Sequence, residues 1–162
     1  EIINSKKAGH CITQNVDNLH QKSGLNEASV TELHGNATFA VCLDCKKRFE
    51  LSFIHEDFKS TNKPPECDSC NGWIKTATIS FGQPMPEDKM IIAHEETLKA
   101  DVFIVAGSSL SVFPAANFPL IAKENDAKLL IVNNEETQFD HFADVLIHDD
   151  ISKTFSNLKI TH

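Results

Sequence analysis

The sequence predicts an α/β fold in which a parallel sheet is covered by helices on both faces and is interrupted by a small inserted module. From residue 76 onward, apolar runs of strand length alternate with segments of helical periodicity, as they do in parallel sheets. Between residues 41 and 75, two Cys-x-x-Cys pairs stand among short strand candidates and polar loops. We therefore expect a Rossmann-like domain from residues 1–40 and 76–162, and a zinc-ribbon insert from residues 41–75.

The elements that precede the alternating region are short. Residues 11–13 and 30–33 are apolar or β-branched runs that predict strands, and residues 19–23 between them predict a short helix. In the insert, residues 39–41 and 48–53 predict two more short strands. The loops around them are rich in Lys, Pro, Asp, Ser and Asn, which is typical of a separate small module.

The alternating region predicts strands and helices in turn. Residues 101–106 form a near-continuous apolar run, as buried parallel strands do. Residues 86–100 begin with Pro and acidic side chains, which favours a helix N-terminus. Ile151, Phe155 and Leu158 lie at i, i+4 and i+7 and so share one face of a final helix. The remaining predictions are strands at 76–81, 128–132 and 143–147 and a helix at 114–125.

Composition excludes several classes of protein. With 162 residues, 41% of them hydrophobic and 23% charged, the chain is long and apolar enough for a folded core and too apolar for a disordered segment. No apolar run approaches the roughly 18 residues of a membrane helix. The net charge of −8, with Arg48 as the single arginine, argues against direct nucleic-acid binding and leaves Lys-rich protein segments as plausible partners.

The four regularly spaced cysteines predict a metal site. Cys42, Cys45, Cys67 and Cys70 form two Cys-x-x-Cys pairs, which complete a tetrahedral zinc site in structural zinc modules. Four thiolates leave no open coordination position, so we expect one structural zinc ion with no catalytic role; redox-active or free cysteines are the alternative. Cys11, next to Ile12 in a predicted strand, is expected to be a core residue. Free thiols and the absence of a signal-peptide pattern predict a reducing compartment, the cytoplasm with the nucleus as an alternative.

Polar loops follow two of the predicted parallel strands. Gly107, Ser108 and Ser109 come after one strand, and Asn133 and Glu135 follow the next. Ligands bind at the carboxyl ends of parallel strands, where backbone N–H groups favour anions and polar side chains reach ribose hydroxyls. An ordinary strand-to-helix loop is an equal alternative for the Gly-Ser-Ser segment, and the usual Gly-rich first loop of a dinucleotide-binding fold is not found in the sequence.

Two further polar segments follow the short strands of residues 11–13 and 30–33. Gln14, Asn15 and Asp17 are amide and carboxyl side chains that suit a site for amides or hydroxyls; a helix start with Asn15 or Asp17 as its N-cap is an equal alternative. His34 stands before Gly35, a residue that allows close backbone approach. One histidine among eight is more often an ordinary surface or core residue than a catalytic one.

Together, these motifs resemble the sirtuins, which are NAD-dependent protein-lysine deacylases, over nearly the whole chain. The shared features occur in the same order in the sequence: Thr13-Gln14-Asn15-Val16-Asp17-Asn18-Leu19-His20, Leu33-His34-Gly35, the two Cys-x-x-Cys pairs, Phe81-Gly82, Gly107-Ser108-Ser109-Leu110 and Ile131-Val132-Asn133.

The resemblance implies a role for each matched position. His34 would be the general base, which accepts a proton from a ribose hydroxyl of NAD. Acyl transfer to NAD would then release free lysine, nicotinamide and an O-acyl-ADP-ribose, so the expected partners are acyl-lysine proteins and the expected co-substrate is NAD. The other implied roles are nicotinamide and ribose binding by Gln14, Asn15 and Asp17, phosphate and ribose binding by Gly107, Ser108 and Ser109, adenosine binding by Asn133 and Glu135, substrate binding by Phe81, Gly82 and Val112, and zinc binding by the four paired cysteines.

The sequence also departs from the sirtuin pattern. Residues 75–83 differ from the family's segment before Phe-Gly-Glu, which predicts a different substrate preference. The N-terminal Gly-Ala-Gly-x-Ser and Gly-Ile-Pro-Asp-Phe-Arg segments are missing, so the resemblance implies a Rossmann-like domain that is incomplete at its N-terminus, from a fragment or a truncated product with impaired activity alone. The alternative functions are a non-catalytic zinc-containing binding module and mono-ADP-ribosyl transfer.

Overall fold

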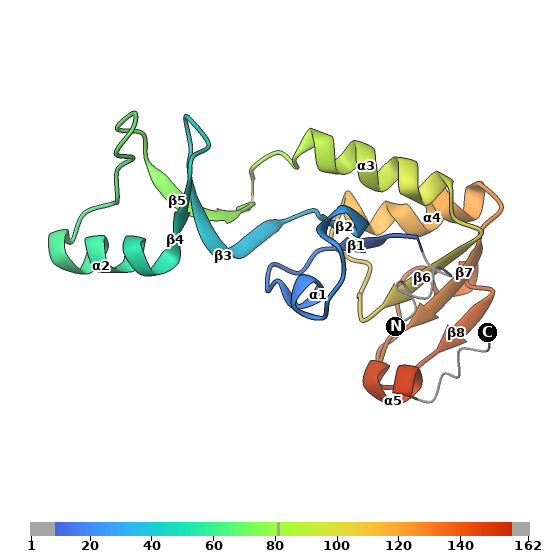
Figure 1. Ribbon diagram of the computed structural model, residues 1–162. Helices are drawn as coiled ribbons and strands as arrows, with labels where there is room; N and C mark the ends of the chain where they lie inside the picture. Colours follow the sequence, from blue (N-terminus) through green and yellow to red (C-terminus); the bar gives the residue numbers. More distant parts are fainter. Residues whose placement is uncertain (1–8, 81, 157–162) are drawn as a thin grey trace. The chain divides into compact units, whose positions relative to one another are not determined.

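The computed structural model describes residues 9–80 and 82–156, which divide into two compact units (Figure 1). The first unit comprises residues 10–89, and the second comprises the described residues from Met90 onward together with Gly9. The expected grouping of residues 1–40 with 76–162 as one domain stays a prediction. No helix in the described ranges has both the length and the apolar character needed to span a membrane.

The first unit begins with two short parallel strands and the helical turns that connect them. Strand β1 (Cys11–Thr13) is followed by helix α1 (Leu19–Lys22), the 3-10 turn η1 (Glu27–Ser29) and strand β2 (Val30–Glu32). The last residues of β1 and β2 are opposite one another in the parallel register. The polar segments that follow the two strands therefore start at the same edge.

The rest of the first unit is an antiparallel sheet with one helix. Strand β3 (Gly35–Cys42) lies between β4 (Arg48–Glu50) and β5 (Ile74–Thr78), and helix α2 (Leu51–Thr61) follows β4 directly. Its small core contains two of the four paired cysteines. The buried members are Ala40, Cys42, Phe49, Ile54, Cys67 and Ile74.

Two sequence-based predictions in this unit are wrong. The sequence predicts that residues 51–53 continue a strand, but they begin α2, because Leu51, Ile54 and Phe58 repeat at helical spacing and Ile54 packs into the core. Strand β5 begins two residues before the expected position 76 and pairs antiparallel with β3, so it belongs to the sheet of the cysteine module and not to a parallel sheet.

The second unit contains the parallel α/β arrangement that the alternating pattern predicts. Strands β6, β7 and β8 are parallel and adjacent in that order, and the expected helix over 114–125 is a 3-10 turn followed by an α-helix that begins with Pro at its first turn. Helix α3 (Glu87–Leu98) begins with the last three residues of the first unit and continues into the second. The elements that follow it are β6 (Val102–Ala106), η2 (Ala115–Asn117), α4 (Phe118–Glu124), β7 (Lys128–Val132), η3 (Asp140–Phe142), β8 (Val145–Ile147) and α5 (Ile151–Ser156).

One face of the parallel sheet forms the core of the second unit. Val105 of β6 and Leu129 and Ile131 of β7 lie in one buried cluster with Ala116 of η2, and α4 contacts both strands. Leu129 and Ile131 are two positions apart along β7, as the two-residue period of a strand requires. This packing fixes the register of β6 and β7, in which Ala106 and Val132 are paired, so the loops after the two strands begin side by side.

Candidate functional site

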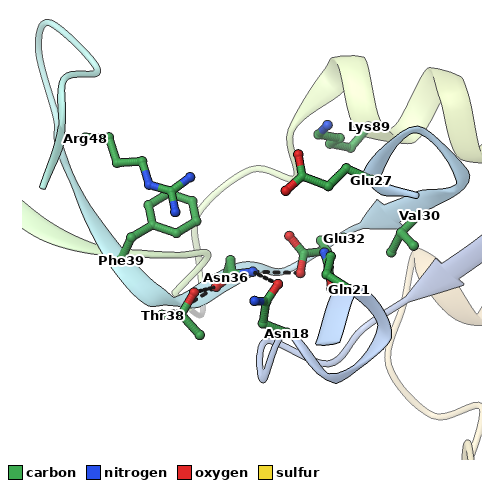
Figure 2. A pocket seen from close by; sticks show the side chains of 10 residues that line it. All are labelled: Asn18, Gln21, Glu27, Val30, Glu32, Asn36, Thr38, Phe39, Arg48 and Lys89. Atoms are coloured by element: carbon green, nitrogen blue, oxygen red, sulfur yellow. Dashed lines mark hydrogen bonds between the residues drawn. The ribbon is translucent and has the colours of Figure 1, made fainter. Parts of the chain in front are cut away.

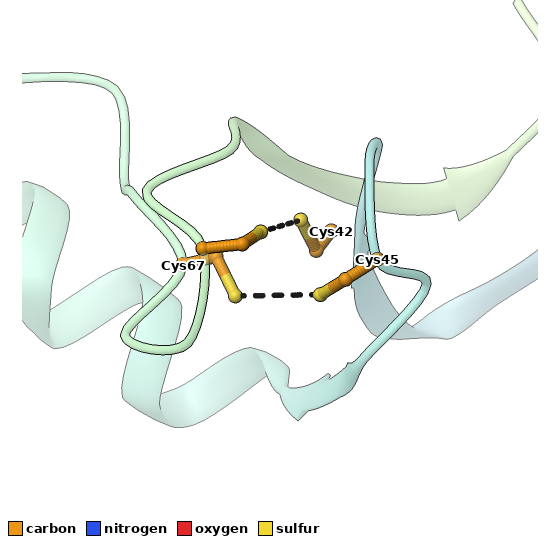
Figure 3. A group of neighbouring side chains, drawn as sticks. Cys42, Cys45 and Cys67 are labelled. Carbon is orange, nitrogen blue, oxygen red and sulfur yellow. Dashed lines mark hydrogen bonds between the residues drawn. The ribbon is translucent and has the colours of Figure 1, made fainter.

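The four paired cysteines converge on one point in the first unit. Their sulfur atoms all lie within 4.8 Å of one another, with 3.5 Å between the Sγ atoms of Cys42 and Cys70 and 3.7 Å between those of Cys45 and Cys67 (Figure 3). Zinc–sulfur bonds of about 2.3 Å place tetrahedral ligands about 3.8 Å apart. The cluster therefore fits one zinc ion, as the spacing in the sequence predicts.

The two Cys-x-x-Cys loops have the same backbone hydrogen bonds. In the first loop, the N–H of Lys46 donates to the carbonyl of Cys42 at 3.2 Å, and the N–H of Cys42 donates to the carbonyl of Lys47 at 2.9 Å. The N–H groups of Asn71 and Cys67 make the equivalent bonds in the second loop, both at 2.8 Å. Lys46 and Asn71 both adopt positive φ angles, 63° and 59°. Each loop is thus shaped locally to present two sulfurs to one ion.

The surroundings affect the paired cysteines unequally. The backbone N–H of Gly72 lowers the pKa of Cys70, but hydrogen bonds with the other three thiols outweigh it and raise this pKa to about 12. The backbone N–H of Cys45, with smaller help from that of Asp44, lowers the pKa of Cys42 to about 7. Lys47 donates to Asp68 at 2.6 Å and to Ser69 at 3.0 Å, so one ammonium group from the first loop is bonded to the second. A positive charge beside the sulfurs stabilises their ionised form, which is the form that binds zinc.

His34 is held by hydrogen bonds at the edge shared by β1 and β2. Its Nδ1 lies 3.1 Å from the carbonyl oxygen of Gln14, and its own carbonyl accepts from the N–H of Ile79 at 2.8 Å. A carbonyl oxygen only accepts, so in the neutral imidazole Nδ1 carries the proton and Nε2 is the basic nitrogen. The side chain is only partly buried, so Nε2 is oriented as a base that a ligand can reach.

The segment after β1 does not contain the helix cap that the sequence offers as an alternative. The N-cap of α1 is Asn18, whose side chain makes no capping bond, and Asp17 accepts from the N–H of Leu19 at 2.9 Å in a local turn. Gln14 behaves differently, because its Nε2 is buried and has no hydrogen-bond partner among the described residues. An orphan amide donor of this kind fits a polar ligand group with an acceptor, such as a carboxamide or a ribose hydroxyl. The side chain of Asn15 is exposed beside it.

A third group of predicted residues lies at the carboxyl edge of the parallel sheet in the second unit. The N–H of Gly107 donates to the carbonyl of Val132 at 2.9 Å, so the loop after β6 starts beside the loop after β7. Gly107 has a φ of 66°, and a Cβ there would lie 2.4 Å from the side chain of Ile151. Glycine is therefore required at the point where this loop leaves the strand.

The polar side chains at this edge bond mostly within their own loops. Ser108 accepts from the N–H of Leu110 at 3.2 Å, and Asn133 donates to the carbonyl of Glu135 at 2.8 Å. The hydroxyl of Ser109 is exposed and within 2.7 Å of the hydroxyl of another serine, Ser111. The arrangement brings Gly107, Ser108 and Asn133 to one edge of one sheet, as expected for a nucleotide loop pair.

The three predicted substrate-binding residues differ in what the structure says of them. Phe81 lies outside the described residues. Gly82 has a φ of 83° with open space around it, and Val112 is 45% exposed in the second unit. The predicted nicotinamide residues and His34 belong to the first unit, whereas the predicted phosphate and adenosine residues belong to the second.

A cavity of about 200 Å³ in the first unit is lined by none of the predicted cofactor residues (Figure 2). On its wall Asn36 donates to Asn18 at 3.2 Å and to Glu32 at 2.8 Å, and the guanidinium of Arg48 lies over the ring of Phe39. This polar network fixes the turn between β2 and β3, which contains His34. In the sequence, the position of Asn36 directly after the His-Gly pair is the signal for this network.

Two residues beside Gln14 and Asn15, Thr13 and His20, have contacts that the sequence does not predict. Thr13 is buried, and its hydroxyl lies within hydrogen-bond distance of both the N–H of Asn15 and the imidazole of His20. Both belong to the recognised polar segment, but no pattern in the sequence shows that a side chain on α1 returns to the end of β1.

Comparison with known proteins gives a consistent set of matches. The family model described as "Sir2 family" matches residues 1–114. An NAD-dependent protein deacetylase of Rhodopseudomonas palustris is 53% identical over 94% of this chain and 60% of its own length. NAD-dependent protein deacylase 2 of Archaeoglobus fulgidus is 43% identical over 84% of this chain and 53% of its own length. The chain thus spans about 60% or less of the length of these curated relatives.

Solved structures match over a similar extent. A structure described as "Sir2-p53 peptide-NAD+" has a TM-score of 0.87 and 36% identity, with 94% of this chain and 62% of that chain covered. The structure of Sir2Tm bound to a propionylated peptide has a TM-score of 0.86 and 37% identity, with 94% of this chain and 63% of that chain covered.

Proposed function

Because this chain belongs to the Sir2 family, we propose that its protein is an NAD-dependent protein-lysine deacylase. The observation that carries the proposal furthest is the bond between Nδ1 of His34 and the carbonyl of Gln14, which leaves Nε2 as an oriented base. Relatives named as protein deacetylases or deacylases, and the propionylated peptide bound to Sir2Tm in a similar solved structure, support acyl-lysine proteins as substrates.

In the proposed reaction NAD is a substrate that is consumed. The carbonyl oxygen of the acyl-lysine forms a bond to the ribose carbon that bears nicotinamide. The bond from this carbon to nicotinamide breaks, and its electron pair leaves with nicotinamide. Nε2 of His34 takes the proton of a ribose hydroxyl, whose oxygen then attacks the acyl carbon. Water completes the release of free lysine and an O-acyl-ADP-ribose. The acyl group therefore moves from nitrogen to oxygen without oxidation or reduction.

The other predicted residues would bind and orient this substrate. The buried amide donor of Gln14 and the exposed amide of Asn15 suit the nicotinamide end, with Asp17 in the same turn. Gly107, Ser108 and Ser109 suit the phosphates and ribose, and Asn133 and Glu135 suit the adenosine end. Phe81, Gly82 and Val112 would contact the acyl-lysine segment. One structural zinc ion would be bound by Cys42, Cys45, Cys67 and Cys70, and a reducing compartment such as the cytoplasm would keep these thiols available.

The test uses the full-length protein with NAD and an acetyl-lysine peptide, followed by mass spectrometry of the peptide and the nucleotide. We expect loss of the acetyl group from the peptide and formation of O-acetyl-ADP-ribose. His34→Ala is expected to lower kcat by about 10²-fold or more, because general base catalysis contributes on that order. The matched control is His55→Ala, an exposed histidine on α2, which should keep wild-type kcat.

Two results would contradict this proposal. A peptide that gains the mass of ADP-ribose would indicate mono-ADP-ribosyl transfer. Wild-type deacylation by His34→Ala would show that another group is the base.

A further inference from the structure

We infer that His20 is a positioning residue that holds the turn of residues 13–15 in the conformation needed to bind nicotinamide. The inference rests on the proposed function, because it concerns the same binding site. It assigns a role to a side chain outside the predicted catalytic and cofactor-binding residues, and this side chain acts through Thr13 rather than through contact with substrate.

The hydroxyl of Thr13 is the centre of this arrangement. Thr13 is the last residue of β1, and only 6% of it is exposed. Its Oγ1 accepts from the backbone N–H of Asn15 at 3.1 Å, which closes a local turn directly after the strand. The same oxygen lies 3.2 Å from Nε2 of His20. One hydroxyl thus joins the turn that presents Asn15 to a side chain on α1.

The imidazole of His20 is fixed at both of its nitrogens. Its Nδ1 lies 3.8 Å from Sγ of Cys11, the first residue of β1, while Nε2 bonds to Thr13. Burial raises the pKa of the Cys11 thiol, so the sulfur keeps its proton and can donate it to Nδ1. Nε2 then carries the N–H that Thr13 accepts. With both nitrogens bonded to β1, the ring cannot rotate without losing a contact at one end of the strand.

The hydrogen bond between His20 and Thr13 matters because amide binding is sensitive to small displacements of the binding groups. Binding groups must be held within about 0.5 Å of their productive positions by neighbours that are themselves fixed. Asn15 is exposed, and its backbone N–H is tied to the buried Thr13 hydroxyl. If His20 no longer anchors that hydroxyl, the turn samples other conformations and nicotinamide recognition weakens. The acyl-lysine contacts do not depend on this bond, whereas His34 depends on it indirectly, because its Nδ1 bonds to the carbonyl of Gln14 in the same turn.

Four substitutions separate the hydrogen bond from general packing. His20→Gln keeps an amide N–H at the position of Nε2, whereas His20→Asn places its polar atoms near Nδ1 and cannot reach Thr13. Thr13→Ser keeps the hydroxyl, and Thr13→Val removes it at nearly constant shape. Each variant of the full-length protein is assayed for the KM of NAD, the KM of an acetyl-lysine peptide, kcat and half-maximal inhibition by nicotinamide.

We expect His20→Asn and Thr13→Val to raise both the KM for NAD and the inhibitory nicotinamide concentration by about fivefold, the effect of one lost hydrogen bond. The KM for the peptide should stay within about twofold, because the lost bond is remote from the acyl-lysine contacts. We expect kcat to fall as well, because the Gln14 carbonyl that orients His34 lies in the same turn. His20→Gln and Thr13→Ser should restore nearly wild-type values. The double variant that combines His20→Asn with Thr13→Val should be no worse than either single variant, because both substitutions remove the same bond.

The outcome also separates this inference from the proposed function. A wild-type protein that does not deacylate in an NAD-dependent way would end the proposed function. An active wild type whose four variants share one KM for NAD, or whose KM for the peptide rises as much as the KM for NAD, would overturn the role of His20 alone. Zinc content and far-UV circular dichroism of each variant show whether it is folded. The KM values for NAD of His20→Gln and His20→Asn are compared on folded protein only.

Discussion

At the scale of single residues, two glycines with similar backbone conformations meet different surroundings. Gly35 follows His34 and has a φ of 76°, and a Cβ on it would lie 2.1 Å from the carbonyl oxygen of Ala77. Gly24 has a φ of 91°, but a Cβ there would meet nothing within 4 Å. Gly35 therefore lets β3 and the end of β5 approach each other beside His34, whereas Gly24 serves only its own turn.

The pair predicts a difference in stability between two alanine variants. Gly24→Ala should cost about 1 kcal/mol, the usual penalty for a positive φ in a residue with a side chain. Gly35→Ala should cost about 3 kcal/mol or more, since the methyl group must also displace backbone. The denaturant midpoint of each zinc-loaded variant measures the difference. Equal midpoints would mean that β3 and β5 separate at this point without cost.

At the scale of elements, one carboxylate connects three parts of the second unit. Asp144, just before β8, bonds to Lys123 on α4 and accepts from the N–H of Leu129 on β7 at 2.8 Å. Lys128 lies 3.4 Å from its other oxygen. These partners, Lys123 first and then the Leu129 N–H, hold the pKa of Asp144 well below its ordinary range.

This arrangement predicts how stability depends on pH. A carboxyl group with a lowered pKa in the folded state stabilises the fold above its unfolded pKa of about 3.9, and this contribution is lost as the pH falls. Asp144→Asn should therefore lower Tm at pH 7, and the difference from wild type should shrink as the pH falls below about 4. Asp126→Asn, on the loop between α4 and β7, is the matched control with little effect. Melting curves of wild type and Asp144→Asn that stay equally far apart at every pH would contradict the role given to the ion pairs.

At the scale of the whole molecule, the two units have separate cores, and different interactions stabilise each core. The core of the first unit includes Cys42 and Cys67, so two of the four cysteines whose arrangement fits zinc are also core residues, while Cys45 and Cys70 are exposed. The core of the second unit is aliphatic and aromatic and includes Val105, Leu129 and Phe139. Metal binding should therefore stabilise the first unit through its own core, while the parallel sheet depends on apolar burial.

Removal of zinc tests this difference. A chelator should speed hydrogen exchange in β3, β4 and β5 far more than in β6 and β7, because only the first sheet loses its ligand-bound core. The protein should contain one zinc per chain; Cys67→Ser should lose it, whereas Cys11→Ser should keep it. Uniform exchange after chelation, or a fold indifferent to the chelator, would argue against a structural metal in the first unit.

The sequence predicted best what depends on local pattern. The strand at 128–132 and the convergence of the four cysteines are confirmed, because apolar periodicity and knuckle spacing determine them. The boundary at Leu51 was missed because Phe49, Leu51 and Phe53 also alternate as a strand would, and only burial of Ile54 decides for a helix. The contact between Thr13 and His20 joins a strand to a helix across a turn, and no pattern in the sequence predicts it.

The short-range backbone hydrogen bonds that close each of the two cysteine loops have a consequence for engineering the protein. Each loop is closed by bonds between residues no more than five positions apart, from Cys42 to Lys47 and from Cys67 to Gly72. The chain between Lys47 and Cys67 contributes none of the four sulfurs. Each doubling of the number of residues in an exposed loop costs only about 0.6 kcal/mol. The exposed Lys63, beyond the end of α2, is therefore a suitable insertion point for a peptide tag or a fluorescent reporter that leaves the metal geometry intact.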